Sequence, residues 1–397
     1  MRNPTSFLSE EYEELVEKSL DWRLKTLYGP SEPFSNVDGR EVIVLCSNNY
    51  LGLTTHPRLK EAALAAIETH GVGSGAVRPI SGTMDLHMEL EERLAKFKGS
   101  EAALTYPTGF MVNSGLIPQL AGRGDLIVSD ELNHGSIIDG VRLTRADRAI
   151  YKHNDTEDLA RVLDEAENHD PEYRRILIIT DGVFSMDGDI APLDEVAKLG
   201  GEHGAMVYVD DAHGEGVLGK GGRGIVSHFG LDHNEVQVEM GTFSKAYGTI
   251  GGHISGSESL AKFAWNKSRT WLLSSSHPPP VVAATIAAID VLESEPQHVE
   301  RLWRNTKRFK KAVEDLGFDT GMSQTPIIPL IVGESSKAKR FSDLLYDEGI
   351  FVVPIVFPMV AQDRARIRVQ MNAKLSLEQL DSVIETIEGT GKKLEII

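Results

Sequence analysis

The chain has a single cysteine, Cys46, among its 397 residues, so an intrachain disulfide is impossible. Such sparing use of cysteine is typical of a reducing compartment, and we expect a cytoplasmic protein in which Cys46 is a small buried residue. Basic residues are also in short supply, because 41 Lys and Arg are outnumbered by 59 Asp and Glu, which gives a net charge of −18. This charge argues against nucleic acid or an anionic membrane as a partner.

Long apolar segments are missing as well. The longest apolar run, residues 281–292, is too short to span a bilayer and contains Asp290. Residues 1–15 are polar and acidic, without the apolar centre of a secretory signal. We therefore expect no membrane partner. The contents of 41% hydrophobic and 25% charged residues are ordinary for a globular protein, and the length suits about two domains.

Residues 57–280 contain a regular alternation of helical patterns and short apolar segments. The apolar segments are 102–106, 126–129, 176–180, 205–210, 236–240 and 252–256. Such alternation is typical of a mostly parallel sheet with helices on both of its faces. We expect an α/β fold in three parts: an N-terminal arm (1–45) with a helical pattern over 8–28, a large domain (46–280), and a smaller C-terminal α+β domain (281–397) that opens with one long helical pattern over 281–316.

The residues with the clearest chemical meaning are Lys245 and Asp210. Lys245 lies in a turn of small residues after the segment 236–240, and Asp210 ends the segment 205–210. In α/β proteins, ligands bind at the carboxyl ends of the strands, so both side chains are expected at one edge of the sheet. A lysine amine forms a Schiff base with pyridoxal phosphate, and an aspartate keeps the pyridine nitrogen protonated so that the ring accepts electrons. The pair therefore predicts a pyridoxal-phosphate enzyme.

His213 follows Asp210 by three residues and could reach the ring oxygen of the cofactor from a loop. Two other interpretations of this segment are weaker. Asp210-Asp211-x-His213 contains metal-ligand types, but no further cluster with ligand spacing accompanies it, and we expect no metal. Gly214-x-Gly216-x-x-Gly219 matches a dinucleotide-binding fingerprint, but the residues after it continue a flexible loop instead of opening the helix that the fingerprint needs.

A phosphate group needs backbone amides at the start of a helix together with hydroxyl groups. Gly109 and Phe110 begin a helical segment directly after a strand and are candidate amide donors. Thr242 is a candidate hydroxyl, and the serine cluster that contains Ser274 and Ser275 is another.

Three further side chains are candidates for the site because of where they lie along the predicted strands. His134 follows the strand 126–129, where an imidazole could stack on the cofactor ring. Arg366 and Arg368 alternate along a strand and should therefore point to one face. One of these guanidinium groups could bind a substrate carboxylate through two parallel hydrogen bonds.

Taken together, these residues resemble the α-oxoamine synthases, a family of fold-type I pyridoxal-phosphate enzymes. The resemblance covers nearly the whole chain. It rests on Ser47-Asn-Asn-Tyr-Leu-Gly-Leu53, Asp130-Glu-Leu-Asn-His134, Asp181-Gly-Val-Phe-Ser-Met-Asp-Gly188, Asp210-Asp-Ala-His213, Gly241-Thr-Phe-Ser-Lys245 and Ala365-Arg-Ile-Arg368. It implies a mostly parallel central sheet with flanking helices, a smaller C-terminal domain, and condensation of a small amino acid with an acyl-CoA thioester.

The resemblance also implies a role for each matching residue. Lys245 would form the Schiff base, Asp210 would pair with the pyridine nitrogen, and His134 would stack on the ring. The ring oxygen would be contacted by His213 and Ser185, the phosphate by Gly109, Phe110 and Thr242, and the amino-acid substrate by Asn48 and Arg368. The family pattern further implies a homodimer, in which Ser274 or Ser275 reaches the phosphate of the other subunit.

Within the family, the segments 77–87, 133–142 and 366–371 most resemble the glycine C-acetyltransferases. We therefore expect condensation of glycine with acetyl-CoA to 2-amino-3-oxobutanoate and CoA. The alternative is 8-amino-7-oxononanoate synthase activity, from alanine and a pimeloyl-type thioester with decarboxylation, or a broad enzyme that does both. His277 and Leu375 depart from the subgroup's pattern. Candidate partners of the CoA phosphates are Arg23, Lys25, Lys267 and Arg269.

Overall fold

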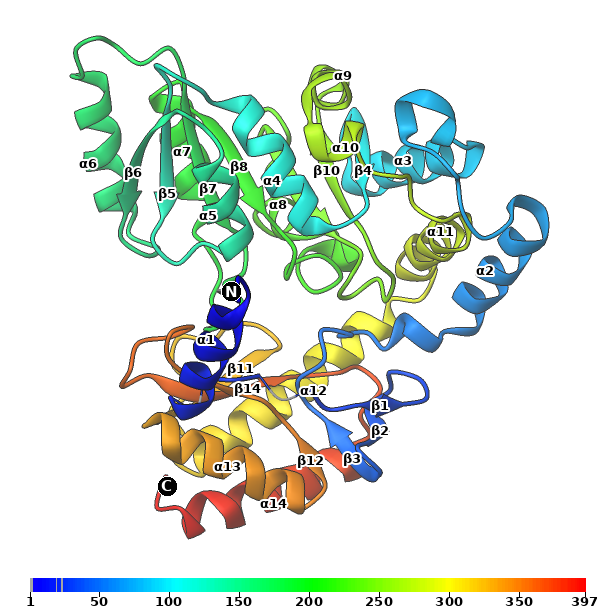
Figure 1. Ribbon diagram of the computed structural model, residues 1–397, viewed down its shortest axis with the longest axis vertical. Helices are drawn as coiled ribbons and strands as arrows, with labels where there is room; N and C mark the ends of the chain where they lie inside the picture. Colours follow the sequence, from blue (N-terminus) through cyan, green and yellow to red (C-terminus); the bar gives the residue numbers. More distant parts are fainter. Residues whose placement is uncertain (1–2, 19, 23) are drawn as a thin grey trace.

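The computed structural model describes residues 3–18, 20–22 and 24–397. A seven-stranded sheet in the order β4-β10-β9-β8-β7-β5-β6 runs through the larger part of the molecule (Figure 1). Its strands are β4 (Ala102–Tyr106), β5 (Leu126–Asp130), β6 (Asp147–Tyr151), β7 (Ile176–Asp181), β8 (Met206–Asp210), β9 (Val238–Thr242) and β10 (Gly252–Gly256). Strands β6, β5, β7, β8 and β9 pair in parallel, and β10 is antiparallel to both β9 and β4. The expected mostly parallel sheet is confirmed.

Helices cover both faces of this sheet, and the alternation of side chains along each strand explains why. Along β7, Ile178 packs into the core beneath α6 and α7, whereas Leu177 and Ile179 pack into the core beneath α4 and α5. The helices of this part are α2 (Pro57–His70), α3 (Asp85–Lys98), α4 (Gly109–Leu120), α5 (Gly135–Arg142), α6 (Thr156–Glu167), α7 (Leu193–Glu202), α8 (Ile225–Phe229), α9 (Glu258–Lys267), α10 (Arg269–Leu272) and α11 (Pro279–Ser294). Apolar residues on both faces of a strand are the pattern of a buried parallel sheet.

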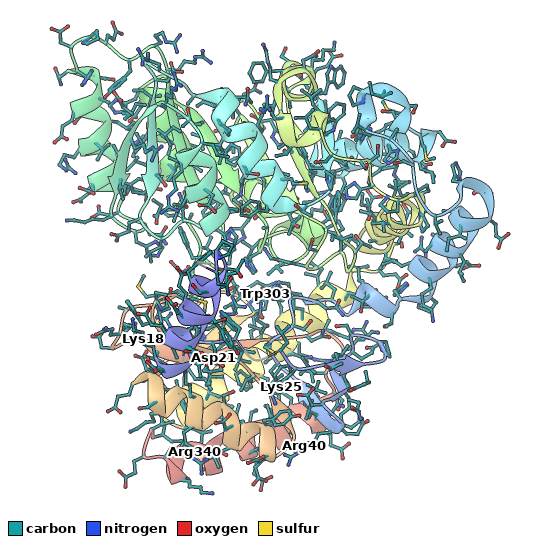
Figure 2. All side chains as sticks on the ribbon, in the orientation of Figure 1. Lys18, Asp21, Lys25, Arg40, Trp303 and Arg340 are labelled. Carbon is teal, nitrogen blue, oxygen red and sulfur yellow. The ribbon has the colours of Figure 1, made fainter. Side chains whose placement is uncertain are left out.

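The smaller part contains two short sheets. One has the order β11-β14-β13, with β11 (Ile327–Gly333), β13 (Pro354–Ile355) and β14 (Ala365–Gln370), and it packs with α12 (Gln297–Asp315), α13 (Ser335–Asp347) and α14 (Leu377–Lys393). The other joins β1 (Leu27–Tyr28), β2 (Phe34–Val37) and β3 (Arg40–Val44) to β12 (Ile350–Phe351). Because β12 pairs in parallel with β3, the N-terminal strands belong to the same body as the C-terminal region (Figure 1). The Trp303 ring nitrogen on α12 donates to the Val217 carbonyl over 2.8 Å and ties this part to the loop after β8 (Figure 2).

Three elements differ from the expectations. Helix α1 spans Ser6–Glu17, so the helical pattern expected over 8–28 is wrong in its second half, where Leu27 begins β1; residues 19 and 23 lie outside the described residues. The helix expected over 281–316 is two helices, since the chain turns at Glu295 and Pro296. Strand β6 was not expected, because an exposed edge strand lacks an apolar pattern.

The contacts of α11 bear on the domain division. This helix packs against α2 and α3, within the large part of the molecule. A boundary between α11 and α12 therefore suits the contacts better than one at residue 281, and the division of the chain stays a proposal. None of the helices within residues 3–18, 20–22 and 24–397 combines the length and apolar character needed to cross a bilayer.

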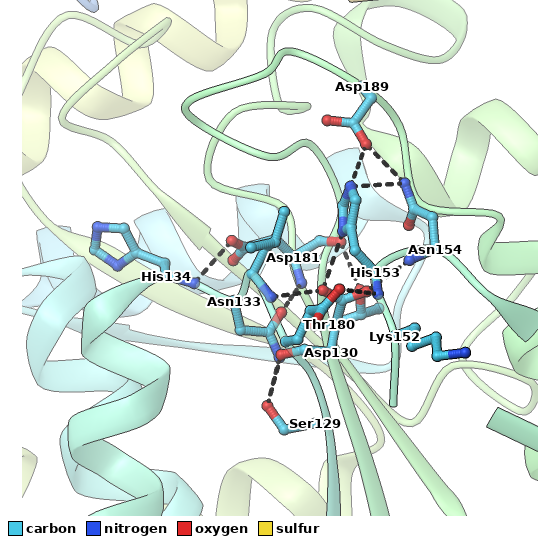
Figure 3. A network of polar contacts seen from close by, with 12 residues as sticks. Ser129, Asp130, Asn133, His134, Lys152, His153, Asn154, Thr180, Asp181 and Asp189 are labelled. Atoms are coloured by element: carbon cyan, nitrogen blue, oxygen red, sulfur yellow. Dashed lines mark hydrogen bonds and ion pairs between the residues drawn. The ribbon is translucent and has the colours of Figure 1, made fainter. Parts of the chain in front are cut away.

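A histidine between two carboxylates ties together the loops at the carboxyl edge of the sheet (Figure 3). His153, just after β6, places Nδ1 3.1 Å from Asp130 Oδ1 and Nε2 2.7 Å from Asp189 Oδ2. The backbone N–H of Asn154 donates to the other oxygen of Asp130, and its side-chain amide donates to Asp189. The ring also packs edge-on against Phe184, with 4.3 Å between centroids. We call these residues the His153 clamp.

The His153 clamp joins two loops that carry predicted site residues. Asp130 ends β5 just before His134, and Asp189 closes the loop that carries Ser185. Burial alone would lower the pKa of His153, but the hydrogen bonds to the two carboxylates raise this pKa to about 10. The ring is therefore a cation at neutral pH, and it neutralises part of the charge of two nearly buried aspartates.

We expect the His153 clamp to make stability fall as pH rises. A histidine whose pKa is raised on folding stabilises fully below its unfolded pKa of about 6.5 and loses that contribution as pH rises through about 10. His153→Gln keeps a donor but not the charge, so it should destabilise by roughly 2–4 kcal/mol at pH 6 and by much less at pH 10. Urea unfolding of both proteins between pH 6 and pH 10 measures this, and parallel pH profiles would contradict the role of the charge.

Candidate active site

A cavity of about 260 Å³ opens at the carboxyl edge of the large sheet. It is lined by Thr108, Gly109, Phe110, His134, Ser136, Asp181, Val183, Ser185, Asp210, Ala212, His213, Met240, Thr242, Ser244 and Lys245. Eight of these were expected from the sequence: Gly109, Phe110, His134, Ser185, Asp210, His213, Thr242 and Lys245. The residues come from the ends of β4, β5, β7, β8 and β9, so the parallel sheet itself brings them together.

Lys245 lies in the turn after β9, and its side chain is half-buried in the cavity. Across the described part of the chain, no hydrogen bond or ion pair engages its amine. Burial lowers the pKa of Lys245 below its usual value, against the opposing pull of the Asp210 and Asp181 carboxylates. A lysine with a lowered pKa and an unengaged amine is prepared to act as a nucleophile or a base.

Asp210 ends β8 with its carboxylate nearly buried. Its Oδ2 accepts a 2.7 Å hydrogen bond from the Asn113 side chain, and its Oδ1 accepts one of 3.1 Å from the Ala212 N–H. Asn113 is itself oriented by the Tyr208 hydroxyl, which donates to its oxygen over 2.6 Å. A carboxylate fixed in this way suits a buried cationic N–H, such as a protonated pyridine nitrogen.

Asp181 is a second carboxyl group at the same edge. It ends β7 and accepts the His134 N–H over 2.9 Å (Figure 3). Burial, and next the charge of Asp210, raise the pKa of Asp181 well above its usual range. The surroundings of Asp181 therefore favour its neutral form beside Asp210, and in that form the carboxyl group can donate or accept a hydrogen bond without adding charge.

The part of the cavity beside the start of α4 suits an anion. Helix α4 begins at Gly109, and Thr108 caps it by accepting the Met111 N–H over 3.2 Å, so the free amides of its first turn point outward at the cavity edge. A Cβ on Gly109 would lie 3.2 Å from the Thr242 hydroxyl, so glycine permits this close approach. The Thr242 hydroxyl donates to the Gly251 carbonyl and accepts the Ser244 N–H. A helix N-terminus beside two hydroxyls fits a phosphate group.

Arg368 and Asn48 lie beside the cavity and do not line it. Arg368 donates over 2.9 Å to the carbonyl of Ser185, a cavity residue, and Arg366 donates to the next carbonyl, so both arginines point to one face of β14 as the strand pattern predicts. The Asn48 oxygen accepts from Gln370 over 2.5 Å. Gln370 links the two predicted substrate contacts, because its side-chain oxygen also accepts from Arg368 over 3.4 Å.

The structure does not bring Ser274 and Ser275 into the cavity of their own chain. Ser275 instead forms a bridge with Val77, and the neighbouring Ser276 N–H donates to Ala76 over 3.0 Å. Large apolar side chains are exposed in this region, notably Val72, Ile80 and Leu273 at 75%, 80% and 68%. An exposed apolar surface of this kind is typical of a contact with another chain.

The candidate CoA contacts remain untested. Arg23 lies outside the described residues. The Lys25 ammonium lies over the Tyr346 ring at 3.6 Å, on the small part of the molecule (Figure 2). Lys267 and Arg269 end α9 and begin α10. Of the two positions that depart from the subgroup's pattern, both Leu375 and His277 are buried. The His277 carbonyl accepts a hydrogen bond from His87 over 3.0 Å.

Several site residues were not expected from the sequence. Asp181 follows the same rule as Asp210, an aspartate at the end of an apolar strand, and that signal could have identified it. Asn113, Tyr50 and Gln370 carry no such signal, because the contacts of Asn113 with Asp210, of Tyr50 with His213 and of Gln370 with Tyr50 all join residues distant in sequence.

Comparison with known proteins identifies the family. The family model for class I and class II aminotransferases matches residues 40–387. The chain is 53% identical to the 8-amino-7-oxononanoate synthase of Symbiobacterium thermophilum over 99% of both proteins, and 47% identical to 8-amino-7-oxononanoate synthase 1 of Bacillus subtilis over 100% of both. Among solved structures, the serine palmitoyltransferase of Sphingomonas wittichii has a TM-score of 0.92 at 31% identity and covers 100% of both chains. The 8-amino-7-oxononanoate synthase of Francisella tularensis has a TM-score of 0.76 at 26% identity, over 90% of this chain and 99% of that one.

The expected activity on glycine and acetyl-CoA is wrong, since the full-length relatives at 47–53% identity are 8-amino-7-oxononanoate synthases. One of the three segments that suggested it, 77–87, contributes to packing away from the cavity. In the segment 77–87, Arg78 forms a buried ion pair of 2.8 Å with Glu91, and His87 holds the carbonyl of His277. Neither residue lines the cavity.

The cavity fits pyridoxal phosphate in each of its parts: an amine without a partner, a fixed buried carboxylate, and a helix N-terminus with hydroxyls. Solved neighbours of the same fold contain this cofactor. The chain belongs to the α-oxoamine synthase family of fold-type I enzymes, and it is a pyridoxal-phosphate-dependent C-acyltransferase.

Proposed function

We propose that this protein is an 8-amino-7-oxononanoate synthase, which condenses alanine with a pimeloyl thioester and releases carbon dioxide. The observation that carries the proposal is the 53% identity, over 99% of both chains, to a protein of that name. The carbon skeleton of the product supports the choice of substrates. Alanine that loses its carboxylate supplies the two carbons at the amino end of the nonanoate chain, and a pimeloyl group supplies the seven that include the ketone.

Each part of the cavity would hold one part of pyridoxal phosphate. Lys245 would bond its aldehyde carbon, and Asp210 would hold the pyridine N–H. His134 would cover one face of the ring, while His213 and Ser185 would contact its oxygen. Gly109, Phe110 and Thr242 would bind the phosphate. When bound, the cofactor supplies an acceptor for the electron pair that is released at the amino acid's α-carbon.

The side chains of this protein would orient the reactants and move protons. The Lys245 amine would take the α-proton of alanine, after which the α-carbon bonds to the thioester carbonyl carbon and the thiolate leaves. The carboxylate then departs as carbon dioxide, and a proton returns to the same carbon. The guanidinium of Arg368 and the amide of Asn48 would hold the alanine carboxylate, because Arg368 contacts the cavity residue Ser185 and both side chains are hydrogen-bonded to Gln370.

The proposal includes a homodimer with shared sites, which the exposed apolar residues near Ser274 and Ser275 support. In this arrangement each serine pair would serve the phosphate of the other subunit. The thioester carrier and its contacts stay a prediction, as does a cytoplasmic location.

Replacing Lys245 with alanine should abolish covalent attachment of pyridoxal phosphate, because the cavity then contains no amine. Borohydride reduction followed by peptide mapping should label Lys245 in the wild-type protein and no lysine in the variant. Lys262→Ala is the matched control, since Lys262 is an exposed lysine on α9 that pairs with Glu258. Label on another lysine of the wild-type protein would exclude the assignment.

Asp210→Asn should keep the cofactor bound while losing turnover. An amide has nearly the shape of the carboxylate but no charge to hold a protonated pyridine nitrogen. A loss of two pKa units at that nitrogen corresponds to about a hundredfold weaker binding of its proton, so kcat should fall by at least that factor. Absorbance of the bound cofactor and steady-state rates measure the two effects separately, and near-normal kcat would refute the role.

The substrate assignment is tested by a panel of alanine, glycine and serine against pimeloyl and acetyl thioesters. We expect alanine with the pimeloyl thioester to exceed glycine with acetyl-CoA in kcat/KM by about a hundredfold or more. Release of carbon dioxide should equal release of free thiol. A preference for glycine with acetyl-CoA would refute the proposed function.

A further inference from the structure

A line of uncharged hydrogen-bonding groups runs from β14 to the histidine that follows Asp210. Gln370 donates from its amide nitrogen to Asn48 Oδ1 over 2.5 Å and to the Tyr50 hydroxyl over 3.2 Å. The Tyr50 hydroxyl lies 2.8 Å from Nδ1 of His213. His213 lines the cavity, whereas Tyr50 and Gln370 lie behind it. Tyr50 and Gln370 have no part in the function proposed above.

The direction of each hydrogen bond in this line is fixed by the chemistry of its ends. The Arg368 guanidinium has only donors, and it lies 3.4 Å from Oε1 of Gln370, so the oxygen of that amide must face the arginine. The amide nitrogen of Gln370 therefore faces Asn48 and Tyr50, and its two protons go to these two oxygens. Tyr50 is an acceptor toward Gln370.

The hydroxyl proton of Tyr50 must then be donated to His213. The side chain is 1% exposed, and burial raises its pKa to about 12, so its hydroxyl keeps its proton and has little access to water. If His213 donated to the same oxygen, the buried O–H would have no acceptor, at a cost of about 1–3 kcal/mol. The O–H of Tyr50 therefore donates to Nδ1 of His213.

The protonation state of His213 completes the argument. Burial, then the positive charges of Lys245 and Arg368, hold the pKa of His213 well below its usual range, so the ring is neutral. A neutral imidazole has one N–H and one bare nitrogen. With Nδ1 accepting from Tyr50, the proton must be on Nε2, the nitrogen left to face the cavity.

We propose that Tyr50 and Gln370 are positioning residues that fix His213 in its Nε2–H tautomer, so that it offers the cavity a hydrogen-bond donor. The acceptor that this donor suits is an anionic or partly anionic oxygen, such as the ring oxygen of the cofactor. The inference rests on the proposed place of pyridoxal phosphate, but it is independent of the choice of amino acid and thioester.

The test reads the tautomer directly. Holoenzyme with nitrogen-15 histidine is studied by NMR, and the His213 signals are assigned by their loss in His213→Gln. We expect a proton on Nε2 and none on Nδ1 in the wild-type protein. Tyr50→Phe should give a mixture of the two tautomers, with kcat for alanine lowered about 10-fold to 100-fold and KM within about twofold.

Gln370→Glu is the second variant, and it should reverse the line. A carboxylate has no proton to give, so Tyr50 would donate to Glu and accept from His213, and the single ring proton would move from Nε2 to Nδ1. Tyr346→Phe is the matched control, because it removes a hydroxyl that donates to the Val37 carbonyl far from the cavity, and it should change neither tautomer nor kcat.

Two results would overturn the inference. One is a proton on Nδ1 in the wild-type holoenzyme, and the other is an unchanged tautomer in both Tyr50→Phe and Gln370→Glu. Neither result depends on turnover, so a failure here is separable from a wrong substrate assignment.

Discussion

The site depends on buried carboxyl groups that are either matched by hydrogen-bond donors or held in their neutral form. Asp130, Asp181 and Asp210 end β5, β7 and β8, which are adjacent strands of the large sheet, and all three side chains are nearly buried. Burial of an unpaired carboxylate costs several kcal/mol, so each must be matched by a donor or become neutral. The structure uses three different solutions: the His153 cation for Asp130, surroundings that favour the neutral form for Asp181, and the Asn113 and Ala212 donors for Asp210.

The same requirement organises a second layer beneath the Lys245 turn. Asp211 is adjacent to Asp210 in sequence but lies against Lys98, whose ammonium is also 2.8 Å from Glu215 and 2.6 Å from Glu239. Burial would raise the pKa of Glu215, but the charges of His253 and Lys98 lower it to about 2. A Cβ on Gly241 would lie 2.2 Å from Glu215, so this cluster packs directly under the strand that leads to Lys245. The paired aspartates that suggested metal ligands therefore face different surroundings, and a lysine cation accompanies Asp211.

Sequence patterns could predict what depends on one strand and the residues just after it. Lys245, Asp210, His213 and Thr242 were found in this way, because a parallel sheet places successive strand ends at one edge. The patterns failed where two distant segments decide the outcome. Asn113 is a site residue only because α4 packs beside β8, and β6 has no apolar pattern because it lies at the edge of the sheet. The substrate prediction, which used the segments 77–87, 133–142 and 366–371, was wrong; in the first of these, Arg78 and His87 form contacts that support the fold.

The line from Gln370 to His213 shows why the links between the two parts of the molecule are uncharged at this point. Gln370 lies on β14 of the small part, and His213 follows β8 of the large sheet. A charged residue in the place of Gln370 would act over a short distance in surroundings of low dielectric constant, where it would shift the pKa values of His213 and Lys245 together. The amide of Gln370 and the phenol of Tyr50 instead fix the direction of the hydrogen bonds without adding a charge. The Asp210 carboxylate and the Arg368 guanidinium can then be positioned separately from the orientation of His213.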